Sequence, residues 1–418
     1  MANSRISLDG ALNGIMDARD LAAINRPTAE ARCLPNALYI RPEALEIERQ
    51  RIFFAGWHCV AVGAQVPEPG DVLPATVAGA PVIVARDRDR KLRAFHNVCR
   101  HRGMQLVVAP KRRQRVFVCP YHGWSYGLDG QLRETPHFEG HNLHEPCAFK
   151  KSDMGLGEIR LECWNDLVFV NLSGDAPPLG RQFAALDARW KNYEFGALRH
   201  VVSMNFEVKA NWKLAIENFL ESYHLPITHP RLNANSRMEL HACMVERDYF
   251  GQLSDDYRGA DVGHGALPCF PNLPESLLRR AEYPTFMPNL MLGLHPEYLF
   301  VFTVDPDGPE RTHETFHFYF VGEGATAPGH AEARDTAIAL WVDTNREDIF
   351  VVEGMHRGRH SPGYRDARFS PHHETTTHAF QRRVANLLAV GARAPAKSPR
   401  AIKRSSPRAE KTRARARA

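Results

Sequence analysis

The chain has 418 residues, of which 44% are hydrophobic and 24% charged, a composition typical of a soluble globular protein with room for two domains. It contains no run of about 18 apolar residues and no basic segment followed by an apolar core at its start, so we expect a cytoplasmic protein with no membrane contact. The net charge of +5 comes from the last 28 residues, which carry ten lysines and arginines against one glutamate, and we expect residues 391–418 to be a disordered basic tail with no specific nucleic-acid partner.

The first half of the chain predicts a small all-β domain. After an N-terminal segment over residues 1–40, "RPEALEIERQRIFFAG" is typical of a short amphipathic helix that leads into Trp57. The segment "APVIVARDRDRKLRAFHNVC" predicts two strands joined by a turn, and the Asp-Gly pair in "WSYGLDGQL" predicts a hairpin. The segments "RVFVC" and "DLVFVNL" predict further strands. We place this domain at residues 41–172.

The second half predicts a mixed domain over residues 173–390. The segments "PLGRQFAALDARWKNY" and "WKLAIENFLESYH" are typical of helices, and residues 331–357 predict a longer one. Between them lie the strand-like segments "HVVSMNFEVKAN", "EYLFVFTVDP" and "RTHETFHFYFVG". The fold class expected for the chain is therefore α+β, with an antiparallel sheet and a long C-terminal helix in the second domain.

Two short loops combine cysteine with histidine. Eight cysteines scattered over a chain of this size indicate metal binding more than a disulfide framework. Cys99 and His101 form a C-x-H motif, and seventeen residues later Cys119 and His122 form a C-x-x-H motif. Tetrahedral zinc and a Rieske [2Fe–2S] cluster both accept two cysteines and two histidines. One cysteine and one histidine from each loop favour the Rieske cluster, because its two irons take different ligands.

These motifs, with the wording "CPYHGW", resemble the Rieske domain of the ring-hydroxylating oxygenase α subunits. The resemblance extends over residues 40–390. In that family the first domain delivers electrons to a mononuclear Fe(II) in a helix-grip-like catalytic domain. The resemblance therefore implies a [2Fe–2S] cluster and a second site built from two histidines and one carboxylate.

The segment "NWKLAIENFLESYHLPITHP" is similar to the iron-binding helix of this family. Glu217, Glu221 and His224 are spaced so that they share one helix face. His224 and His229 lie about 140° apart on an ideal helix, too far to meet one metal. We expect Pro226 to end the helix near His224, so that His229 returns from the loop. Taken without the resemblance, these histidines are more typical of solvated or capping residues than of a ligand pair.

The carboxylate is expected from "LWVDTNREDIFVVEGMHRG". On a helix, Asp348 shares a face with three apolar residues, Trp341, Val352 and Met355. An aspartate on such a face must be paired, hydrogen-bonded or bound to metal. Family members carry their ligating aspartate in a matching "ED" pair. We expect Glu347 to point away and Asp343 to lie off this face. With His224 and His229, Asp348 would complete the facial triad of a non-haem Fe(II) oxygenase.

The resemblance gives Glu221 a catalytic role. Many ring-hydroxylating dioxygenases carry aspartate here, whereas members acting on quaternary ammonium compounds carry glutamate. The implied role is to orient the iron ligand His224 and to bridge it to the cluster ligand His122 of the partner subunit. This bridge requires a head-to-tail homotrimer, in which the cluster of one subunit faces the iron of the next.

The expected function is the terminal oxygenase component, or α subunit, of a Rieske oxygenase. It would use O2 and electrons from a separate NAD(P)H-dependent reductase, with or without a ferredoxin, to hydroxylate a small aromatic or carboxylated substrate. The alternative is monooxygenation or demethylation of a quaternary ammonium compound of the betaine, carnitine or choline type. The aromatic residues of "HETFHFYF" suit either a cage for such a cation or the core of a sheet. A rival class, an electron-transfer protein with this fold, predicts an incomplete triad.

Overall fold

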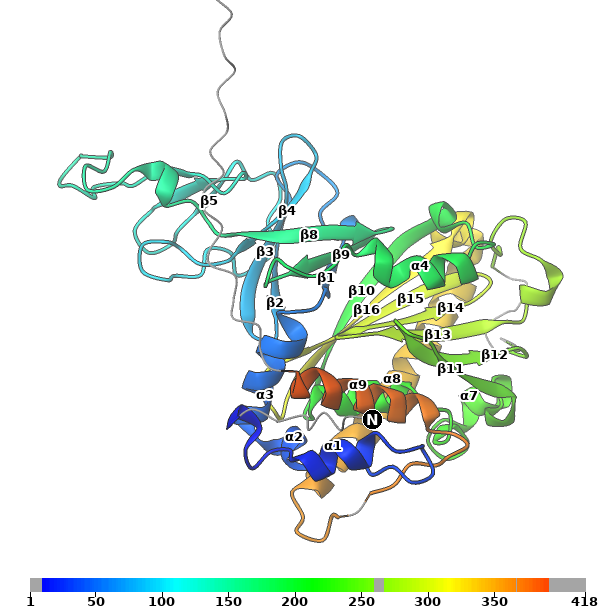
Figure 1. Cartoon of the computed structure of the whole chain (residues 1–418). Helices are drawn as coiled ribbons and strands as arrows, with labels where there is room; N and C mark the ends of the chain where they lie inside the picture. The colour runs from blue at the N-terminus through cyan, green and yellow to red at the C-terminus, as the bar shows by residue number, and fades with distance from the viewer. Residues whose placement is uncertain (1–9, 259–266, 366, 391–418) are drawn as a thin grey trace, which may run out of the picture.

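The computed structural model describes residues 10–258, 267–365 and 367–390, and the basic tail lies outside them. These residues form an N-terminal β-domain and a larger C-terminal α+β domain (Figure 1). The antiparallel sheets and the long C-terminal helix confirm the expected fold class. In the part of the chain described, no helix combines the length and apolar character needed to span a bilayer.

The β-domain is built from two antiparallel sheets. The larger has six strands in the order β1-β9-β8-β4-β3-β2, and the smaller has three in the order β5-β6-β7. The β3–β4 and β6–β7 pairs confirm the two predicted hairpins. The strands are β1 (His58–Val62), β2 (Val72–Val77), β3 (Ala80–Arg86), β4 (Leu92–His96), β5 (Val116–Val118), β6 (Ser125–Gly127), β7 (Leu132–Glu134), β8 (Glu158–Trp164) and β9 (Leu167–Asn171).

The second domain is centred on one sheet of seven antiparallel strands, in the order β10-β16-β15-β14-β13-β12-β11. Successive side chains of a strand face opposite sides, so both faces of this sheet are buried. Leu299 and Val301 pack in the same cluster as α4, whereas Phe300 and Phe302 pack with the long helices. The strands are β10 (Leu198–Val208), β11 (His241–Val245), β12 (Phe250–Ser254), β13 (Ala281–Phe286), β14 (Leu290–Leu294), β15 (Tyr298–Pro306) and β16 (Thr312–Val321).

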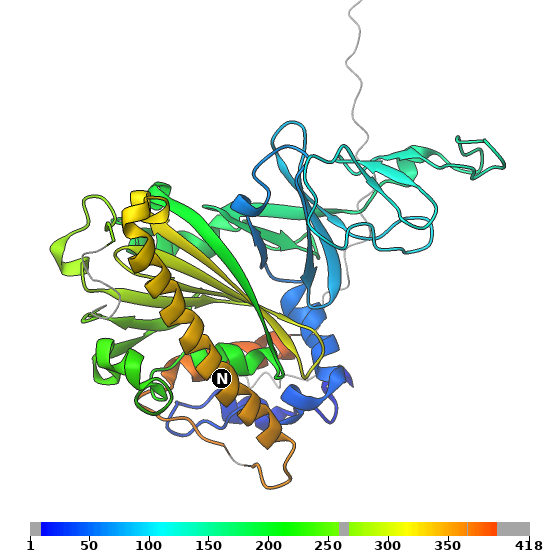
Figure 2. The ribbon, with the colours of Figure 1, turned by 180° about the vertical axis from the view of Figure 1, so that it is seen from behind.

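Helices cover the two faces of this sheet. Helix α8 crosses one face over its whole width (Figure 2), and α4 lies on the other. The N-terminal helices pack with α9 beside α8 rather than on the β-domain. The helices are α1 (Ala18–Ile24), α2 (Ala37–Ile40), α3 (Pro42–Glu48), α4 (Gly180–Arg189), α5 (Trp212–Phe219), α6 (Leu225–Thr228), α7 (Pro230–Asn235), α8 (Ala331–Arg359) and α9 (Thr375–Ala389), and a π-helical turn, Arg49–Phe53, follows α3.

A partly buried aspartate near the end of β15, Asp305, joins the two domains. Asp305 accepts hydrogen bonds from the Thr76 hydroxyl at 2.5 Å and from the Ala78 N–H at 2.6 Å, and its carboxylate lies 3.3 Å from His58 Nε2. Burial alone would raise the pKa of Asp305, but these partners hold it below its usual value. These contacts hold the edge of the β-domain against the seven-stranded sheet.

A buried ion pair holds α3 against α5. Lys213 Nζ lies 2.6 Å from Glu48 Oε1, and both side chains are fully buried. The indole N–H of Trp212 donates to the other oxygen of Glu48 at 2.8 Å. Removing charges from water is costly, and here the pairing and the indole hydrogen bond offset that cost. Helix α3 thus supports the helix that leads to the predicted iron ligands.

Candidate functional site

The two cysteine loops have the same backbone design. Each begins just after a strand, β4 or β5. In each loop the cysteine N–H donates at 2.8 Å to the carbonyl five residues later, which is Met104 for Cys99 and Trp124 for Cys119. The N–H of the glycine four residues after the cysteine, Gly103 or Gly123, donates to the cysteine carbonyl at 3.0 Å. Both glycines have positive φ, +78° and +73°, a conformation in which a side chain would be strained.

The loops bring the four predicted cluster ligands together. The Cys99 and Cys119 thiols are buried, and burial raises the pKa of Cys99. The rings of His101 and His122 are 4.7 Å apart, and His101 stacks on Trp124 at 4.8 Å. Nδ1 of His101 is buried and has no hydrogen-bond partner among the described residues. A [2Fe–2S] cluster fits this donor set, with thiolates on the inner iron and imidazoles on the outer one.

The predicted iron segment folds differently from the expectation. Helix α5 ends at Phe219, so Glu221 lies beyond it and does not share a helix face with Glu217. Glu217 instead accepts a hydrogen bond from Tyr39 at 2.5 Å. Pro226 also does not end a helix, because it lies in the first turn of α6. His224 immediately precedes that short helix and His229 immediately follows it, and the two rings are 5.0 Å apart.

Tertiary hydrogen bonds explain the early end of α5. A helix leaves its last carbonyl oxygens without partners inside the helix. The Thr376 hydroxyl donates to the Leu220 carbonyl at 2.5 Å, and Gln252 Nε2 donates to the Phe219 carbonyl at 3.2 Å. These donors come from α9 and β12, far along the chain, so the local sequence carries no sign of them.

The three predicted iron ligands converge. Nε2 of His229 lies 2.8 Å from Asp348 Oδ1, and Nε2 of His224 lies 3.5 Å from the same oxygen. One ligand atom from each residue lies within 4.8 Å of the others. Two imidazoles and one carboxylate on one side of a space match the facial triad of non-haem iron sites, which leaves the other positions open.

Both histidines are oriented by a glutamate. Nδ1 of His224 lies 2.5 Å from Glu221 Oε1, and Nδ1 of His229 lies 2.6 Å from Glu347 Oε2. A carboxylate only accepts hydrogen bonds, so each Nδ1 carries a hydrogen, and Nε2 of each ring, which faces Asp348, would bind the metal once the metal replaces the hydrogen there. The expectation that Glu347 points away is wrong. Sequence reasoning missed its role because Glu347 contacts a histidine that lies outside its own helix.

The other expectations for α8 are partly confirmed. Asp343 is exposed and pairs with Arg346 at 2.9 Å, off the apolar face, as expected. Trp341 and Val352 are buried as predicted. Met355 is exposed, contrary to the prediction, whereas His356 next to it is buried.

The site favours positive charge at its centre. Burial alone would lower the pKa of His224, but hydrogen bonds to Asp348 and Glu221 raise it to about 10. Burial would raise the pKa of Asp348, but its hydrogen bonds to His224 and His229 hold it below its usual value. A divalent cation would satisfy the same carboxylates.

A narrow cavity leads from Asp348 toward the sheet. It measures about 40 Å³, and a second cavity of about 60 Å³ on the histidine side shares Asp348, Phe219 and Trp341 with it. Its walls are largely aromatic, formed by Phe219, Phe300, Phe302, Phe316 and Trp341. Glu314, only 3% exposed, contributes a carboxylate that accepts a hydrogen bond from Asn345 Nδ2 at 3.1 Å. Sequence analysis missed Glu314, although it alternates with Phe316 and Phe318 in "HETFHFYF" and so belongs to their apolar face.

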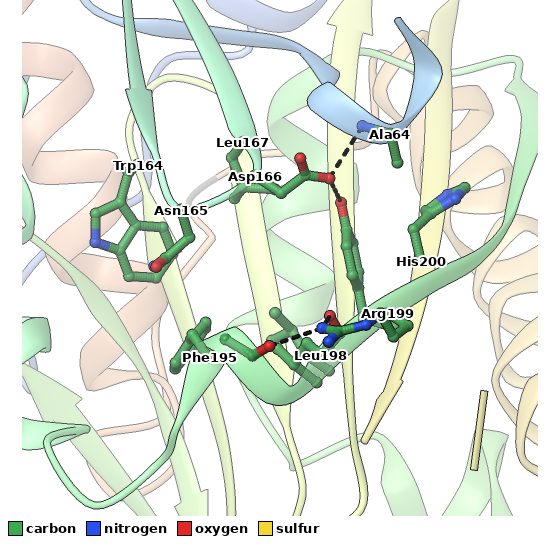
Figure 3. Close-up of a pocket in the computed structure, with 12 residues that line it drawn as sticks. Ala64, Trp164, Asn165, Asp166, Leu167, Phe195, Leu198, Arg199 and His200 are labelled. Carbon is green, nitrogen blue, oxygen red and sulfur yellow. Dashed lines mark hydrogen bonds between the residues drawn. The ribbon is translucent and has the colours of Figure 1, made fainter. Parts of the chain in front are cut away.

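A larger cavity lies elsewhere. It measures about 450 Å³ and lies between the β8–β9 turn and the start of β10 (Figure 3). Asp166 in its wall accepts hydrogen bonds from the Tyr319 hydroxyl at 2.8 Å and the Ala64 N–H at 3.2 Å. Arg199 donates to two backbone carbonyls. None of the predicted site residues lines this cavity, so its size does not make it the reaction site.

Comparison with known proteins agrees with this geometry. Residues 56–162 match the family model of the Rieske [2Fe-2S] domain, and residues 195–390 match the ring hydroxylating alpha subunit (catalytic domain). Choline monooxygenase of Spinacia oleracea is 25% identical over 363 residues, covering 85% of this chain and 78% of the relative. The carnitine monooxygenase oxygenase subunit of Escherichia coli K12 is 27% identical over 345 residues, covering 80% and 86%. A solved quaternary ammonium Rieske monooxygenase shares the fold with a TM-score of 0.74, at 24% identity, over 88% of this chain and 98% of that one.

The β-domain with its paired cysteine and histidine loops, joined to a sheet-and-helix domain with two histidines and an aspartate, defines a two-centre iron oxygenase. The chain belongs to the Rieske non-haem iron oxygenases, as an oxygenase α subunit. Its cofactors are a Rieske [2Fe–2S] cluster and a mononuclear iron, and it works with O2, an organic substrate and a separate reductase.

Proposed function

We propose that this oxygenase acts on a quaternary ammonium compound, the alternative of the two substrate classes expected from the sequence. The observation that carries the proposal is the aromatic cavity beside Asp348, which contains a single buried carboxylate, Glu314. Aromatic faces attract a trimethylammonium group, and a desolvated carboxylate strengthens that attraction. The relatives named for choline and carnitine oxidation support the same substrate class.

An aromatic acid is a poorer fit to this cavity. Its carboxylate would meet Glu314, which is negative when ionised, and no lining residue is a cation that could pair with it. Repulsion of like charges in a site from which water is largely excluded is strong. The charge pattern thus favours a cationic substrate over the small aromatic or carboxylated one that was our first expectation. A betaine or carnitine carries both charges, and its carboxylate would have to extend toward the wider cavity.

We assign the site residues as follows. Cys99, Cys119, His101 and His122 hold the cluster, and His224, His229 and Asp348 hold the iron. When bound, the iron supplies the O2 chemistry and the cluster supplies electrons one at a time. The residues of the chain orient the ligands, exclude water and hold the cationic group next to the iron.

We further propose a head-to-tail homotrimer that receives electrons from an NAD(P)H-dependent reductase, with or without a ferredoxin. Glu221 then orients His224 and bridges it to His122 of the partner subunit. The exposure of the His122 ring supports this arrangement. We place the Rieske domain at residues 41–172 and the catalytic domain at 173–390, with the segment before residue 41 packed on the catalytic domain through α1 and α9.

A substrate panel tests the proposed function. The purified oxygenase, loaded with cluster and iron, receives electrons from a surrogate reductase and is offered choline, carnitine and glycine betaine beside benzoate and other aromatic acids. Products are identified by mass, and O2 uptake is followed. Turnover of a quaternary amine is expected, with loss of activity but an unchanged cluster spectrum in His224→Ala. Turnover confined to the aromatic acids would overturn the proposal.

A further inference from the structure

A second group of two histidines and one carboxylate lies at the C-terminal end of α8. His356 and His360 are four residues apart, a spacing that places both on one face of a helix. Glu310, in the loop between β15 and β16, faces them from the neighbouring element. His360 Nε2 lies 3.6 Å from Glu310 Oε1, the two imidazole rings are 5.2 Å apart, and one ligand atom of each residue lies within 4.8 Å of the others.

The buried histidine of this group has no protein partner that accounts for it. His356 is 4% exposed, and neither of its ring nitrogens has a hydrogen-bond partner among the described residues. Buried polar atoms are almost always satisfied, so an unpartnered imidazole that faces a second imidazole and a carboxylate indicates a missing ligand. Burial lowers the pKa of His356, which keeps the ring neutral and available to bind metal.

The positive charges of Arg359 and Lys213 oppose a cation at His356, but both residues lie beside acidic partners. Lys213 is neutralised by Glu48, and Arg359 lies 4.0 Å from the Glu217 carboxylate while its guanidinium covers the Tyr39 ring at 3.6 Å. Arg357, the other basic residue of the last turn, reaches back to Glu353 at 3.6 Å. The C-terminal end of a helix carries partial negative charge, which favours a cation.

We propose that Glu310, His356 and His360 bind a divalent metal ion of the zinc type, separate from the catalytic iron. Two imidazoles and one carboxylate are ligands that zinc accepts at about 2.0 to 2.2 Å. Tetrahedral coordination then places neighbouring donor atoms about 3.4 Å apart, close to the 3.6 Å between His360 and Glu310. Glu310 and His360 are exposed, so the ion has access from solvent and water completes its coordination.

The ion would stabilise the contact between two elements that support the iron site, α8 and the β15–β16 loop. It would tie the end of α8, the helix that carries Asp348, to the β15–β16 loop. The carbonyl of Pro309 in that loop accepts a hydrogen bond at 3.1 Å from Asn211, the residue that caps α5. The metal site is therefore linked to both helices that position the iron ligands, and its role is structural.

The experiment counts zinc on the full chain loaded with cluster and iron. The protein is titrated with Zn²⁺ against a chromophoric chelator, and metal content is measured after gel filtration. One tight equivalent of zinc per chain is expected, with cluster and iron unchanged. His360→Ala and Glu310→Gln should each lose that equivalent. Both residues are exposed, so these changes leave the core intact. His313→Ala, which removes an exposed histidine that pairs with Asp307, should retain the zinc.

Two further readouts separate this site from the iron site. Zinc should raise the melting temperature of the wild-type protein and of His313→Ala, but not that of His360→Ala. His224→Ala should still bind the tight equivalent, because its deletion affects only the iron triad. Equal zinc binding by wild type and His360→Ala, no tight binding by the wild type, or binding that appears only as iron is displaced would each overturn the proposal.

Discussion

At the scale of single residues, two glutamates orient the histidines of the proposed iron site. Glu221 and Glu347 each hold the Nδ1 of one histidine, so Nε2 of each faces Asp348. Glu221 comes from the same segment as its histidine, whereas Glu347 reaches His229 from α8. The two glutamates have the same role, because each accepts a hydrogen bond from one imidazole. Glu347 also connects α8, which carries Asp348, to the segment that carries the two histidines.

Glu347→Gln tests this orienting role. An amide is a weaker acceptor than a carboxylate and can present its NH2 group to Nδ1 instead. We expect iron affinity to fall by roughly 10- to 100-fold, the usual effect of losing such a partner. The measurement is iron retention against a chelator, with the cluster spectrum as an internal reference. Asp343→Asn, an exposed change one turn earlier, is the control, and equal iron retention in all three proteins would contradict the assignment.

Glu314 predicts a pH dependence of substrate binding. Burial raises the pKa of Glu314, the hydrogen bond from Asn345 lowers it, and the charge of nearby Asp348 adds a smaller rise, with a net pKa of about 8. A cation is attracted only by the ionised carboxylate. Affinity for a quaternary amine should therefore be highest above pH 8 and should fall as the pH drops below it, by up to about 10-fold per unit.

Glu314→Gln removes this titration. We expect the Kd for the amine, measured by calorimetry between pH 6.5 and 9, to lose most of its pH dependence and to rise at pH 9 by about 10- to 100-fold, the loss of an attraction of up to about 3 kcal/mol at close range. The cluster spectrum and iron content should not change. A variant with the wild-type pH profile would show that another group controls binding.

At the scale of elements, the sequence predicted what depends on local pattern. The two hairpins were predicted from turn residues that lie between runs of alternating apolar and polar residues. Helix α8 was predicted from a long segment with helical periodicity. The residues proposed to hold the cluster and the iron were selected from motif spacing and resemblance, and the structure brings each group together. The end of α5 was mispredicted because its last carbonyls are satisfied by Thr376 and Gln252, which no local pattern links to it. Glu347 was missed for the same reason, since it acts across elements, whereas the alternation in β16 already placed Glu314 on an apolar face.

The α3–α5 ion pair predicts a large and specific loss of stability. Lys213→Met leaves the Glu48 carboxylate buried without a counter-charge, a change that typically costs about 3 to 5 kcal/mol. We expect a clear fall in melting temperature. The double variant Glu48→Gln/Lys213→Met removes both charges while the glutamine still accepts from Trp212, so it should regain much of the loss. Lys209→Met, an exposed lysine just before α5, should change little, and equal stability of the single and double variants would contradict the argument.

At the scale of the whole molecule, the two metal centres are far apart within one chain. The β5 end of the β-domain, with the cluster loops, and α7, which follows the iron histidines, lie at opposite ends in both views (Figures 1 and 2). Large apolar side chains are exposed beside each centre, including Tyr121 near the cluster and Tyr223 and Ile227 near the iron. Exposed apolar surface of this kind typically marks a contact with another protein. A head-to-tail assembly would cover both surfaces and bring the cluster of one subunit to the iron of the next.

Mixed trimers test transfer between subunits. Cys119→Ala should remove the cluster but leave the iron, and His224→Ala should do the reverse, so each homotrimer should be inactive. The two variants are dissociated into folded subunits, mixed and allowed to reassemble. Some interfaces will then pair an intact cluster with an intact iron site.

Part of the activity should then return, in proportion to the fraction of such interfaces. With equal amounts and random assembly, about one interface in four joins the intact cluster of one variant to the intact iron of the other, because each neighbour is drawn independently. Activity near one quarter of the wild-type value is therefore expected, measured as turnover per trimer after mass spectrometry has shown that the trimers are mixed. Transfer within a single subunit predicts no recovery at all, since no chain in the mixture carries both centres. That result in mixed trimers would also remove the bridging role proposed for Glu221 and leave it only the orientation of His224.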